Sequence, residues 1–362
     1  MQLTRHEASA DPDVVLNRPM PPGLAWGIAI GALAVIFALD RATALAPVQH
    51  LYYLPIIFAG IRFSYRGGAL GAAAAILLYH AANPLVMTFP YTPTASAVQG
   101  GARGGPPTTY SGYELAWADE FDRDGEPDAK KWTYERGFVR NRELQWYQPE
   151  NARVAGGLLT IEARRERVAN PNFERGSSEW RRDREFAEYT SSSLMTKGLH
   201  EWRYGRFEMR GRIDTRPGLW PAFWTLGTAG PWPHGGEIDI MEYYRGTLLA
   251  NVAWGGAKPF QPIWADTRKP LESFEPGWSS AFHLWRMDWD ERAIMLSVDG
   301  LRLNEVELTR TVNQDGSGRN PFREPQYLLL NLAIGGSAGG DPSTTAFPAR
   351  FEVDFVRVYK RT

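Results

Sequence analysis

One short segment, Gly-Glu-Ile-Asp-Ile-Met-Glu, places three acidic side chains in an apolar run that favours β-structure. Carboxylates are costly in such a run unless they have a chemical task. In a regular strand Glu237 and Asp239 share one face, and Glu242 points to the other. A β-bulge at Ile240-Met241 would return Glu242 to the first face, and bulges are common beside active sites. The spacing therefore predicts a bulged strand with three carboxyl groups on one face.

Carboxyl groups in this arrangement suit the cleavage of a sugar linkage. Most glycosidases use two of them, about 5–5.5 Å apart for retention of configuration and about 6.5–9.5 Å apart for inversion. The spacing in the sequence does not choose between these outcomes. The alternative is an acidic edge strand whose carboxylates are solvated.

The same segment resembles the active-site motif of glycoside hydrolase family 16, in the bulged form found in laminarinase-like endo-β-glucanases, agarases and carrageenases. The resemblance extends over about 250 residues, which makes it far more specific than one short motif. The other segments that resemble this family occur in family order: Tyr113–Asp122, Asn141–Tyr147, Tyr204–Arg212, Gly218–Gly227, Phe282–Trp289, Val298–Gly300, Asn331–Gly336 and Val353–Tyr359.

The resemblance implies a role for each carboxyl group. Glu237 would be the nucleophile, Glu242 the general acid/base, and Asp239 the residue that orients Glu237. The implied activity is that of an endo-acting, retaining β-glycosidase that needs no cofactor and hydrolyses a polysaccharide, foremost a β-1,3-glucan or a mixed-linkage β-glucan. Three alternatives stay open: a transglycosylase, a sulfated-galactan hydrolase, and a non-catalytic glycan-binding sensor that could dispense with both glutamates.

Aromatic and polar residues near this segment are candidates for sugar binding. The chain contains 14 tryptophans, and a flat indole covers the apolar face of a pyranose ring well. Trp220 and Trp232 adjoin prolines in Gly- and Pro-rich stretches, which favours loops and sugar contact. Trp224 alternates with apolar neighbours and is expected beneath the site. The family pattern adds Asn141 and Glu143 as sugar-binding groups.

One departure from the laminarinase pattern concerns the strand after the acidic one. Many such enzymes carry a histidine there, shortly before a glycine, whereas this chain reads Asn-Val-Ala-Trp-Gly-Gly over residues 251–256. A polar contact near the cleaved sugar is therefore missing or replaced by Trp254. The departure weakens the assignment to β-1,3-glucan but leaves hydrolysis unaffected.

A structural calcium site is the one metal site that the resemblance implies. Asp354 would supply a carboxylate, and Glu120 and Gly157 would supply backbone oxygens, which suits the preference of calcium for six to eight oxygen ligands. The chain has six histidines and no cysteine, which argues against a catalytic zinc ion.

The fold class follows from the pattern of short alternating runs after residue 113. Many short strands without intervening helices predict an all-β sandwich or barrel, and the family implies a β-jelly-roll of two curved antiparallel sheets over residues 113–362. The clearest expected strands, with an Asp299-Gly300 hairpin turn, are 193–196, 207–213, 293–298 and 351–358.

The first 90 residues predict an α-helical membrane region. Three apolar stretches, at about 23–39, 45–61 and 69–89, approach the ~20 residues that a helix needs to cross a bilayer. Arginines precede the first stretch and separate the second from the third, so the positive-inside rule places the N-terminus in the cytoplasm. We therefore expect a multi-pass protein of the cell membrane with an extracytoplasmic catalytic domain. If one stretch were a buried or re-entrant hairpin, the topology would reverse.

The remaining segments predict a linker and a surface loop. Residues 91–112 are rich in Gly, Pro, Thr and Ala and read as a flexible linker. Residues 164–185 mix arginines with acidic residues and read as a surface loop beside the site. The net charge of −1 argues against a nucleic-acid partner, and we expect a monomeric catalytic domain.

Overall fold

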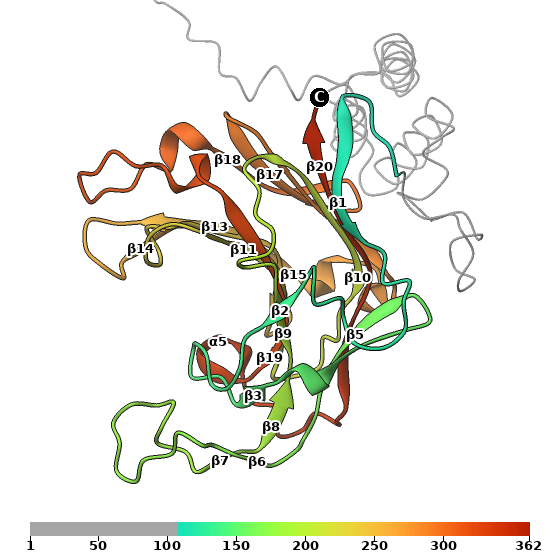
Figure 1. The fold of residues 1–362 in the computed structure, drawn as a ribbon, viewed down its shortest axis with the longest axis vertical. Coiled ribbons are helices and arrows are strands. Elements are labelled where there is room, and N and C mark those ends of the chain that lie inside the picture. Colours follow the sequence, from blue (N-terminus) through green and yellow to red (C-terminus); the bar gives the residue numbers. More distant parts are fainter. Residues whose placement is uncertain (1–107) are drawn as a thin grey trace, which may run out of the picture. The chain divides into compact units, whose positions relative to one another are not determined.

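The computed structural model describes residues 108–362, which form two eight-stranded antiparallel sheets (Figure 1). This arrangement confirms the predicted all-β sandwich. The three predicted membrane stretches and most of the predicted linker lie outside the described residues, so these boundaries stay predictions. Within residues 108–362, no helix is both long enough and apolar enough to cross a bilayer.

The first sheet has the strand order β18-β17-β16-β10-β20-β5-β4, and β1 also pairs with β20. The long strand β20 pairs with β10 along one edge and with β5 and β1, one after the other, along its other edge. The strands of this sheet are β1 (Tyr113–Asp119), β4 (Ala152–Ala155), β5 (Leu158–Ala163), β10 (Gly205–Arg212), β16 (His283–Trp289), β17 (Ala293–Val298), β18 (Leu301–Glu307) and β20 (Ala349–Arg361).

The second sheet has the order β14-β13-β12-β11-β19-β9-β2, and β15 also pairs with β13. Strand β12 contains all three acidic residues and lies between β11 and β13. The strands of this sheet are β2 (Thr133–Tyr134), β9 (Ser193–Met195), β11 (Leu219–Gly227), β12 (Glu237–Tyr244), β13 (Thr247–Gly255), β14 (Pro262–Ala265), β15 (Arg268–Pro270) and β19 (Gln326–Ile334).

Short elements complete the fold. Strands β3 and β8 form a parallel pair, and β6 and β7 form a two-residue antiparallel pair. The bounds are β3 (Gln145–Tyr147), β6 (Val168–Ala169), β7 (Phe186–Ala187), β8 (Tyr189–Ser191), the short helix α5 (Gly336–Gly339), and the 3-10 turns η4 (Pro149–Asn151), η5 (Leu271–Ser273), η6 (Trp278–Ser280), η7 (Leu308–Arg310) and η8 (Pro321–Arg323).

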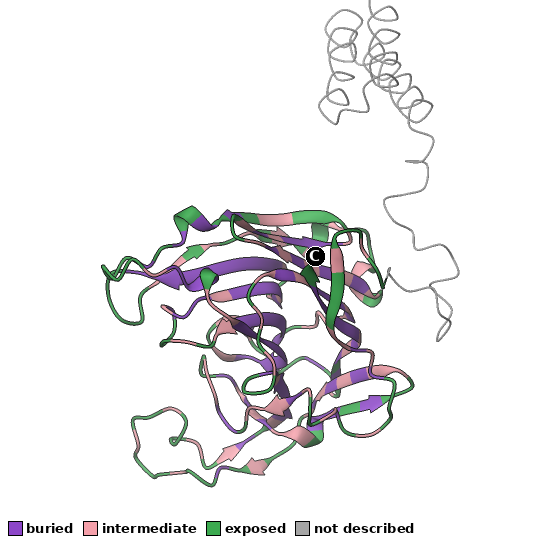
Figure 2. Ribbon diagram, turned by 45° about the horizontal axis from the view of Figure 1, so that its top comes forward, coloured by how far each residue is buried: buried purple, intermediate pink, exposed green. Residues whose placement is uncertain are grey.

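The main core lies between the two sheets, where Figure 2 shows the buried strands. Alternate residues of each strand point inward, as the period of a β-strand requires. On β19, Leu328, Leu330 and Leu332 enter this core, whereas Tyr327 and Leu329 belong to a smaller cluster on the other face. The second sheet therefore has a core face and an outer face, and the outer face is free to carry functional groups.

The expected strands agree closely with the observed ones. The predicted run 193–196 corresponds to β9, 207–213 to β10, 293–298 to β17 and 351–358 to the central part of β20. The turn between β17 and β18 is confirmed too: Val298 pairs with Leu301, and the two turn residues between them have positive φ, as a two-residue hairpin requires.

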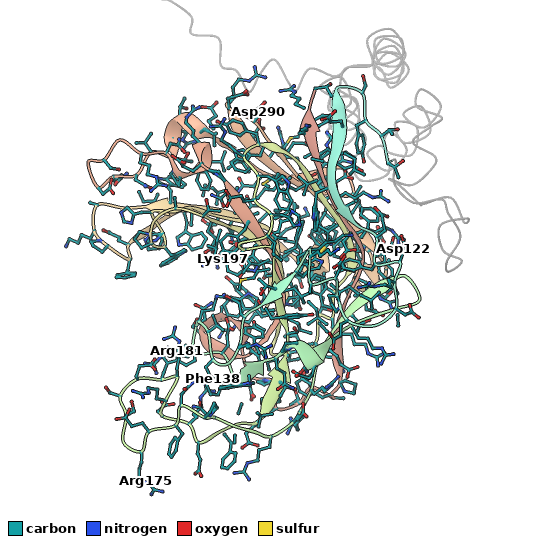
Figure 3. The ribbon with its side chains drawn as sticks, viewed as in Figure 1. Asp122, Phe138, Arg175, Arg181, Lys197 and Asp290 are labelled. Carbon is teal, nitrogen blue, oxygen red and sulfur yellow. The ribbon has the colours of Figure 1, made fainter. Side chains whose placement is uncertain are left out.

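The predicted surface loop at residues 164–185 carries the short strand β6 and projects at the bottom of Figure 1. Figure 3 shows Arg175 at its far end and Arg181 closer to the body of the domain. Two arginines attach the loop to the segment before β3: Arg181 donates to the carbonyl of Val139 (2.6 Å), and Arg184 donates to the carbonyl of Glu143 (2.9 Å).

Candidate active site

The bulge predicted in β12 is present. Asp239 pairs with Asn251 of β13 and Glu242 pairs with Leu249, so two residues of β12 oppose one residue of β13. The register with β11 shifts at the same place. Both residues of the bulge, Ile240 and Met241, point into the main core. The bulge therefore turns Glu242 to the outer face beside Glu237 and Asp239, and we call this face the carboxylate face.

A glycine lets the chain enter β12 at the required angle. Gly236, directly before Glu237, has a φ of +83°, in the left-handed region that favours glycine. A Cβ atom there would lie 2.9 Å from a side-chain carbon of Pro321 and 3.0 Å from Phe322. The position of Glu237 thus depends on close packing of its neighbour against η8.

Each of the two glutamates is held by the indole N–H of a tryptophan. Trp232 Nε1 donates to Glu237 Oε2 over 2.8 Å, and Trp220 Nε1 donates to Glu242 Oε1 over 2.6 Å. Both tryptophans were expected to bind sugar, and the structure places both at the carboxyl groups. Direct sugar contact by either one stays a prediction.

Asp239 lies between the two glutamates in a polar network. It is buried, and a hydrogen bond with Glu237 lowers the pKa of Glu237 while raising the pKa of Asp239. A hydrogen bond between two carboxyl groups requires that one of them carries a proton. Asn251 interacts with both sides of the site: it hydrogen-bonds Asp239, and its Nδ2 lies 3.4 Å from Glu242 Oε2.

Burial raises the pKa of all three carboxyl groups because it disfavours the charged form. Desolvation raises the pKa of Glu237 and that of Glu242 to about 7, against the opposing effect of their tryptophan donors. The pKa of Asp239 is raised well above its ordinary value by desolvation and by the charges of both glutamates. Groups that influence each other in this way titrate as a set, so near neutral pH one can be ionised while another is protonated.

The neighbouring strands β11 and β19 supply a rigid support. Trp224 is buried on the carboxylate face, where its Nε1 donates to Asn331 Oδ1 (2.7 Å). Asn331 in turn donates to the hydroxyl of Tyr147 (3.1 Å). Arg140 lies over the ring of Trp224, with its guanidinium carbon 4.9 Å from the ring centre, and its charge lowers the pKa of Glu237. Arg140 itself is ion-paired with Glu135.

Asn141 and Glu143 belong to this network rather than standing alone. Glu143 is buried, and burial raises its pKa. It accepts hydrogen bonds from Gln145 Nε2 (2.7 Å) and Asn141 Nδ2 (3.3 Å), and Gln145 is fixed by the backbone N–H of Ile334 (2.7 Å). The charge of Glu143 raises the pKa of Glu242, so Glu143 acts on the site electrostatically.

The expectation for Trp254 does not agree with the structure. Trp254 belongs to the main core between the sheets, because residues of β13 alternate between faces and Asn251 and Ala253 take the outer positions. A sugar on the carboxylate face would therefore meet Asn251 instead. The sequence signal for Asn251 was its polar side chain in an otherwise apolar strand; Arg140 and Asn331 were missed because their placement depends on strand pairing.

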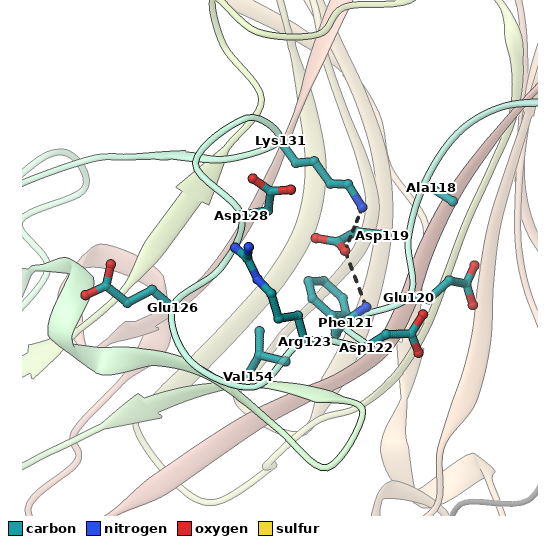
Figure 4. A pocket seen from close by; sticks show the side chains of 10 residues that line it. All are labelled: Ala118, Asp119, Glu120, Phe121, Asp122, Arg123, Glu126, Asp128, Lys131 and Val154. Carbon is teal, nitrogen blue, oxygen red and sulfur yellow. Dashed lines mark hydrogen bonds and ion pairs between the residues drawn. The ribbon is translucent and has the colours of Figure 1, made fainter.

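The expected calcium ligands lie near the junction of β1, β5 and β20. Glu120 lines a pocket of about 250 Å³, and in this pocket the carboxylate of Asp119 forms an ion pair with Lys131 (Figure 4). The carboxylate of Asp354 pairs with Arg210 (2.7 Å), and that of Glu120 pairs with Arg357. Within residues 108–362, no three or more acidic, histidine or cysteine side chains are placed so that they could hold a metal ion together, so backbone oxygens would have to complete the site. Calcium binding stays a prediction.

Comparison with known proteins bears on the family of this chain. The family model "Glycosyl hydrolases family 16" matches residues 145–357. A beta-glucanase of Rhodothermus marinus is 38% identical over 266 residues, which cover 68% of this chain and 85% of that protein.

Two solved structures extend the comparison. The catalytic domain of the Thermotoga maritima laminarinase has a TM-score of 0.58 at 33% identity and covers 69% of this chain and 99% of its own. A structure from a study of endo-acting O-glycanases of the human gut microbiota has a TM-score of 0.65 at 33% identity, with 71% and 94% covered. The residues that carry the carboxylate face lie inside the matched region, and the chain belongs to glycosyl hydrolase family 16 and is a glycoside hydrolase.

Proposed function

We propose that this protein is an endo-acting, retaining β-glucanase that hydrolyses internal linkages of a β-1,3-glucan or a mixed-linkage β-glucan. The observation that carries the proposal is the bulged strand, which puts two glutamates on one face, each held by an indole N–H. The relatives with matching domains support the substrate class, because they are named as a beta-glucanase and a laminarinase.

The first chemical step uses the glutamates in opposite protonation states. The ionised carboxylate of Glu237 attacks the anomeric carbon and forms a glycosyl ester, while the bond to the leaving oxygen breaks. Glu242 gives its proton to that oxygen, so the shortened chain leaves as a neutral alcohol. Asp239, protonated and hydrogen-bonded to Glu237, orients the nucleophile.

The second step reverses these roles. Glu242, now a carboxylate, takes a proton from water, and the oxygen of that water attacks the anomeric carbon. The ester bond breaks and Glu237 is released as a carboxylate. Two inversions give net retention, and the proton remains on Glu242 for the next cycle.

The experiment is reducing-end release by the purified full-length protein on laminarin, mixed-linkage glucan, agarose, carrageenan and mucin, with Glu237→Gln beside it. Proton NMR of the first product reports its anomeric configuration. Cleavage of laminarin or mixed-linkage glucan with β-products, lost in Glu237→Gln, is the expected result. Cleavage of only a galactan, or inversion, would contradict the proposal, and glycan binding by both proteins without cleavage would indicate the sensor.

The membrane attachment is part of the same proposal. It rests on the three apolar stretches within residues 23–89 and on the distribution of arginines around them. An anchored, extracytoplasmic hydrolase would meet polysaccharide at the cell surface, where such polymers are available.

A further inference from the structure

The exposed aromatic side chains of the domain gather in one place. Within residues 108–362, the Phe, Trp and Tyr residues that are exposed are three: Trp232 (39% exposed), Phe260 (74%) and Trp264 (41%). They come from the loop before β12, the turn between β13 and β14, and β14 itself. Exposed aromatic groups that cluster in this way usually mark a binding surface.

Strand pairing connects Trp264 directly to the nucleophile. Glu237 pairs with Ala253 of β13, and Ala253 pairs with Trp264 of β14. Residues in one such row share a face, so Trp264 lies on the carboxylate face. The neighbours of Trp264 on β14, Ile263 and Ala265, pack against the core instead. Two strand spacings put the backbone of Trp264 about 10 Å from that of Glu237.

Phe260 and Trp232 line a cavity of about 340 Å³ beside this row. That volume is within the range of small-molecule sites, which combine apolar walls with a few placed polar groups. The cavity has both kinds of lining, since the aromatic rings stand among His234, Asn313, Asp315 and Arg319.

The polar residues also fix the shape of this cavity. Asn313 accepts a hydrogen bond from the backbone N–H of Gly255 (2.8 Å) and donates to the carbonyl of His234 (2.9 Å). One side chain thereby ties together the segment 313–319, the end of β13 and the loop before β12. Trp232 connects the cavity to the reaction centre, because the same indole donates to Glu237.

We propose that Trp232, Phe260 and Trp264 form a sugar-binding track that extends the site from Glu237 across β13 to β14. The track binds glycosyl units of the polysaccharide at least two units from the cleaved bond. Their apolar faces stack on the rings, and their hydroxyl groups meet the polar lining of the cavity. This inference rests on the proposed function, because it assigns substrate subsites to the same reaction.

The track predicts a dependence on chain length. A glucan that reaches Phe260 and Trp264 gains binding there, whereas a short oligosaccharide that occupies only the centre does not. Because the stacked units are remote from the reacting atoms, losing them should raise KM and leave kcat nearly unchanged. For Phe260→Ala and Trp264→Ala we expect KM on laminarin to rise about tenfold each, which corresponds to ~1.4 kcal/mol.

The experiment compares laminarin with the shortest oligosaccharide that the full-length enzyme cleaves. Phe260→Tyr and Trp264→Phe keep an aromatic ring and should keep KM within about twofold, as should Leu301→Ala, an exposed large apolar residue of the first sheet. Equal KM values for wild-type, Phe260→Ala and Trp264→Ala proteins on laminarin would overturn the track. Equal losses on long and short substrates would overturn it too.

A binding measurement separates failure of the track from failure of the proposed function. Titration calorimetry uses the Glu237→Gln protein with laminarin, mixed-linkage glucan, agarose, carrageenan and mucin in turn, with and without Phe260→Ala and Trp264→Ala. If the wild-type protein cleaves no glucan but one of these polymers binds about tenfold more weakly to the aromatic variants, only the glucanase assignment fails. Binding that is unchanged in the aromatic variants, or absent for every polymer, would overturn the track.

Discussion

At the residue scale, Glu237 and Glu242 each accept a hydrogen bond from an indole N–H, although one is the proposed nucleophile and the other the proposed general acid. An indole N–H stabilises the ionised form of each glutamate and so lowers its pKa. For Glu237 this favours the nucleophile. For Glu242 it works against keeping the proton, so the elevated pKa of Glu242 has to come from burial and from the charges of Glu237 and Glu143.

The tryptophan donors can be tested through the pH profile of kcat/KM. The acidic limb should follow ionisation of Glu237 and the alkaline limb should follow loss of the proton from Glu242. Trp232→Phe removes a donor and raises the pKa of Glu237, so the acidic limb should move up by about one pH unit. Trp220→Phe should move the alkaline limb up by a similar amount. Limbs that stay in place, or move down, would show that these bonds do not control the titration.

Glu242 can be tested by supplying an external nucleophile. Loss of general acid/base catalysis in Glu242→Gln should lower kcat by about 10²- to 10⁴-fold. An azide ion needs no base, so it should attack the glycosyl ester on Glu237 directly and release a β-glycosyl azide, partly restoring turnover of a substrate with a good leaving group. Mass spectrometry and NMR identify that product. Its absence, or an α-azide, would contradict the double-displacement mechanism.

Asp239 can be tested through stability. Its pKa in the folded protein is raised, so the folded state holds a proton that the unfolded state has lost, and stability falls as pH rises above about 4. Asp239→Asn avoids this loss. We expect its Tm to exceed that of the wild-type protein by at least about 3 °C at pH 8, and the difference to shrink toward pH 4. Calorimetry at pH 4 and pH 8 measures the Tm of both proteins. A Tm difference that is larger at pH 4 than at pH 8 would contradict a raised pKa for Asp239.

At the element scale, one bulge decides which side of β12 carries the second glutamate. The pairing partners change from Asp239 with Asn251 to Glu242 with Leu249, and both intervening side chains enter the core. The bulge therefore satisfies packing and catalysis together.

Deletion of Ile240 tests the bulge. The deletion leaves one residue between Asp239 and Glu242, so regular alternation alone puts Glu242 on the face of Glu237 and Asp239. We expect the deletion variant to retain hydrolysis without a bulge and to have a lower Tm, because the buried side chain of Ile240 is lost. Reducing-end release and thermal unfolding measure the two effects. Ile240→Val, which keeps the residue count, should cost only about 1 kcal/mol and retain activity. Loss of hydrolysis in a folded deletion variant would show that the bulge itself is needed to orient Glu242.

The strands with clear alternation could be predicted from sequence, and so could the bulge, because its acidic residues are costly anywhere else. The pairing of strands far apart in the chain could not. The prediction for Trp254 was wrong. The position of Trp254 relative to a glycine does not indicate which face of β13 it occupies, because the register of β13 with β12 determines that face. Trp264 was missed for the same reason, although its place between Ile263 and Ala265 in an alternating run was a usable signal.

At the scale of the whole molecule, the proposed membrane attachment is open to a direct test. The full-length protein should sediment with membranes and require detergent for release, because each apolar stretch approaches the ~20 residues of a spanning helix. Protease added to intact cells, or to spheroplasts if the cells have an outer membrane, should degrade the domain that contains residues 113–362. Recovery in a salt wash would contradict anchoring, and protection from protease in intact spheroplasts would reverse the topology.

The topology of the first sheet determines when the domain can fold during its synthesis. Strand β20 pairs with β10, β5 and β1, and its register joins Arg361 to Tyr113. Contacts between residues so far apart form slowly, because a long loop must close first. During synthesis on the ribosome, β1 therefore cannot pair with β20 until residues 349–361 have emerged. When export is coupled to translation, a domain of this topology enters a translocation channel before it can fold, so its native sheet forms only after transport.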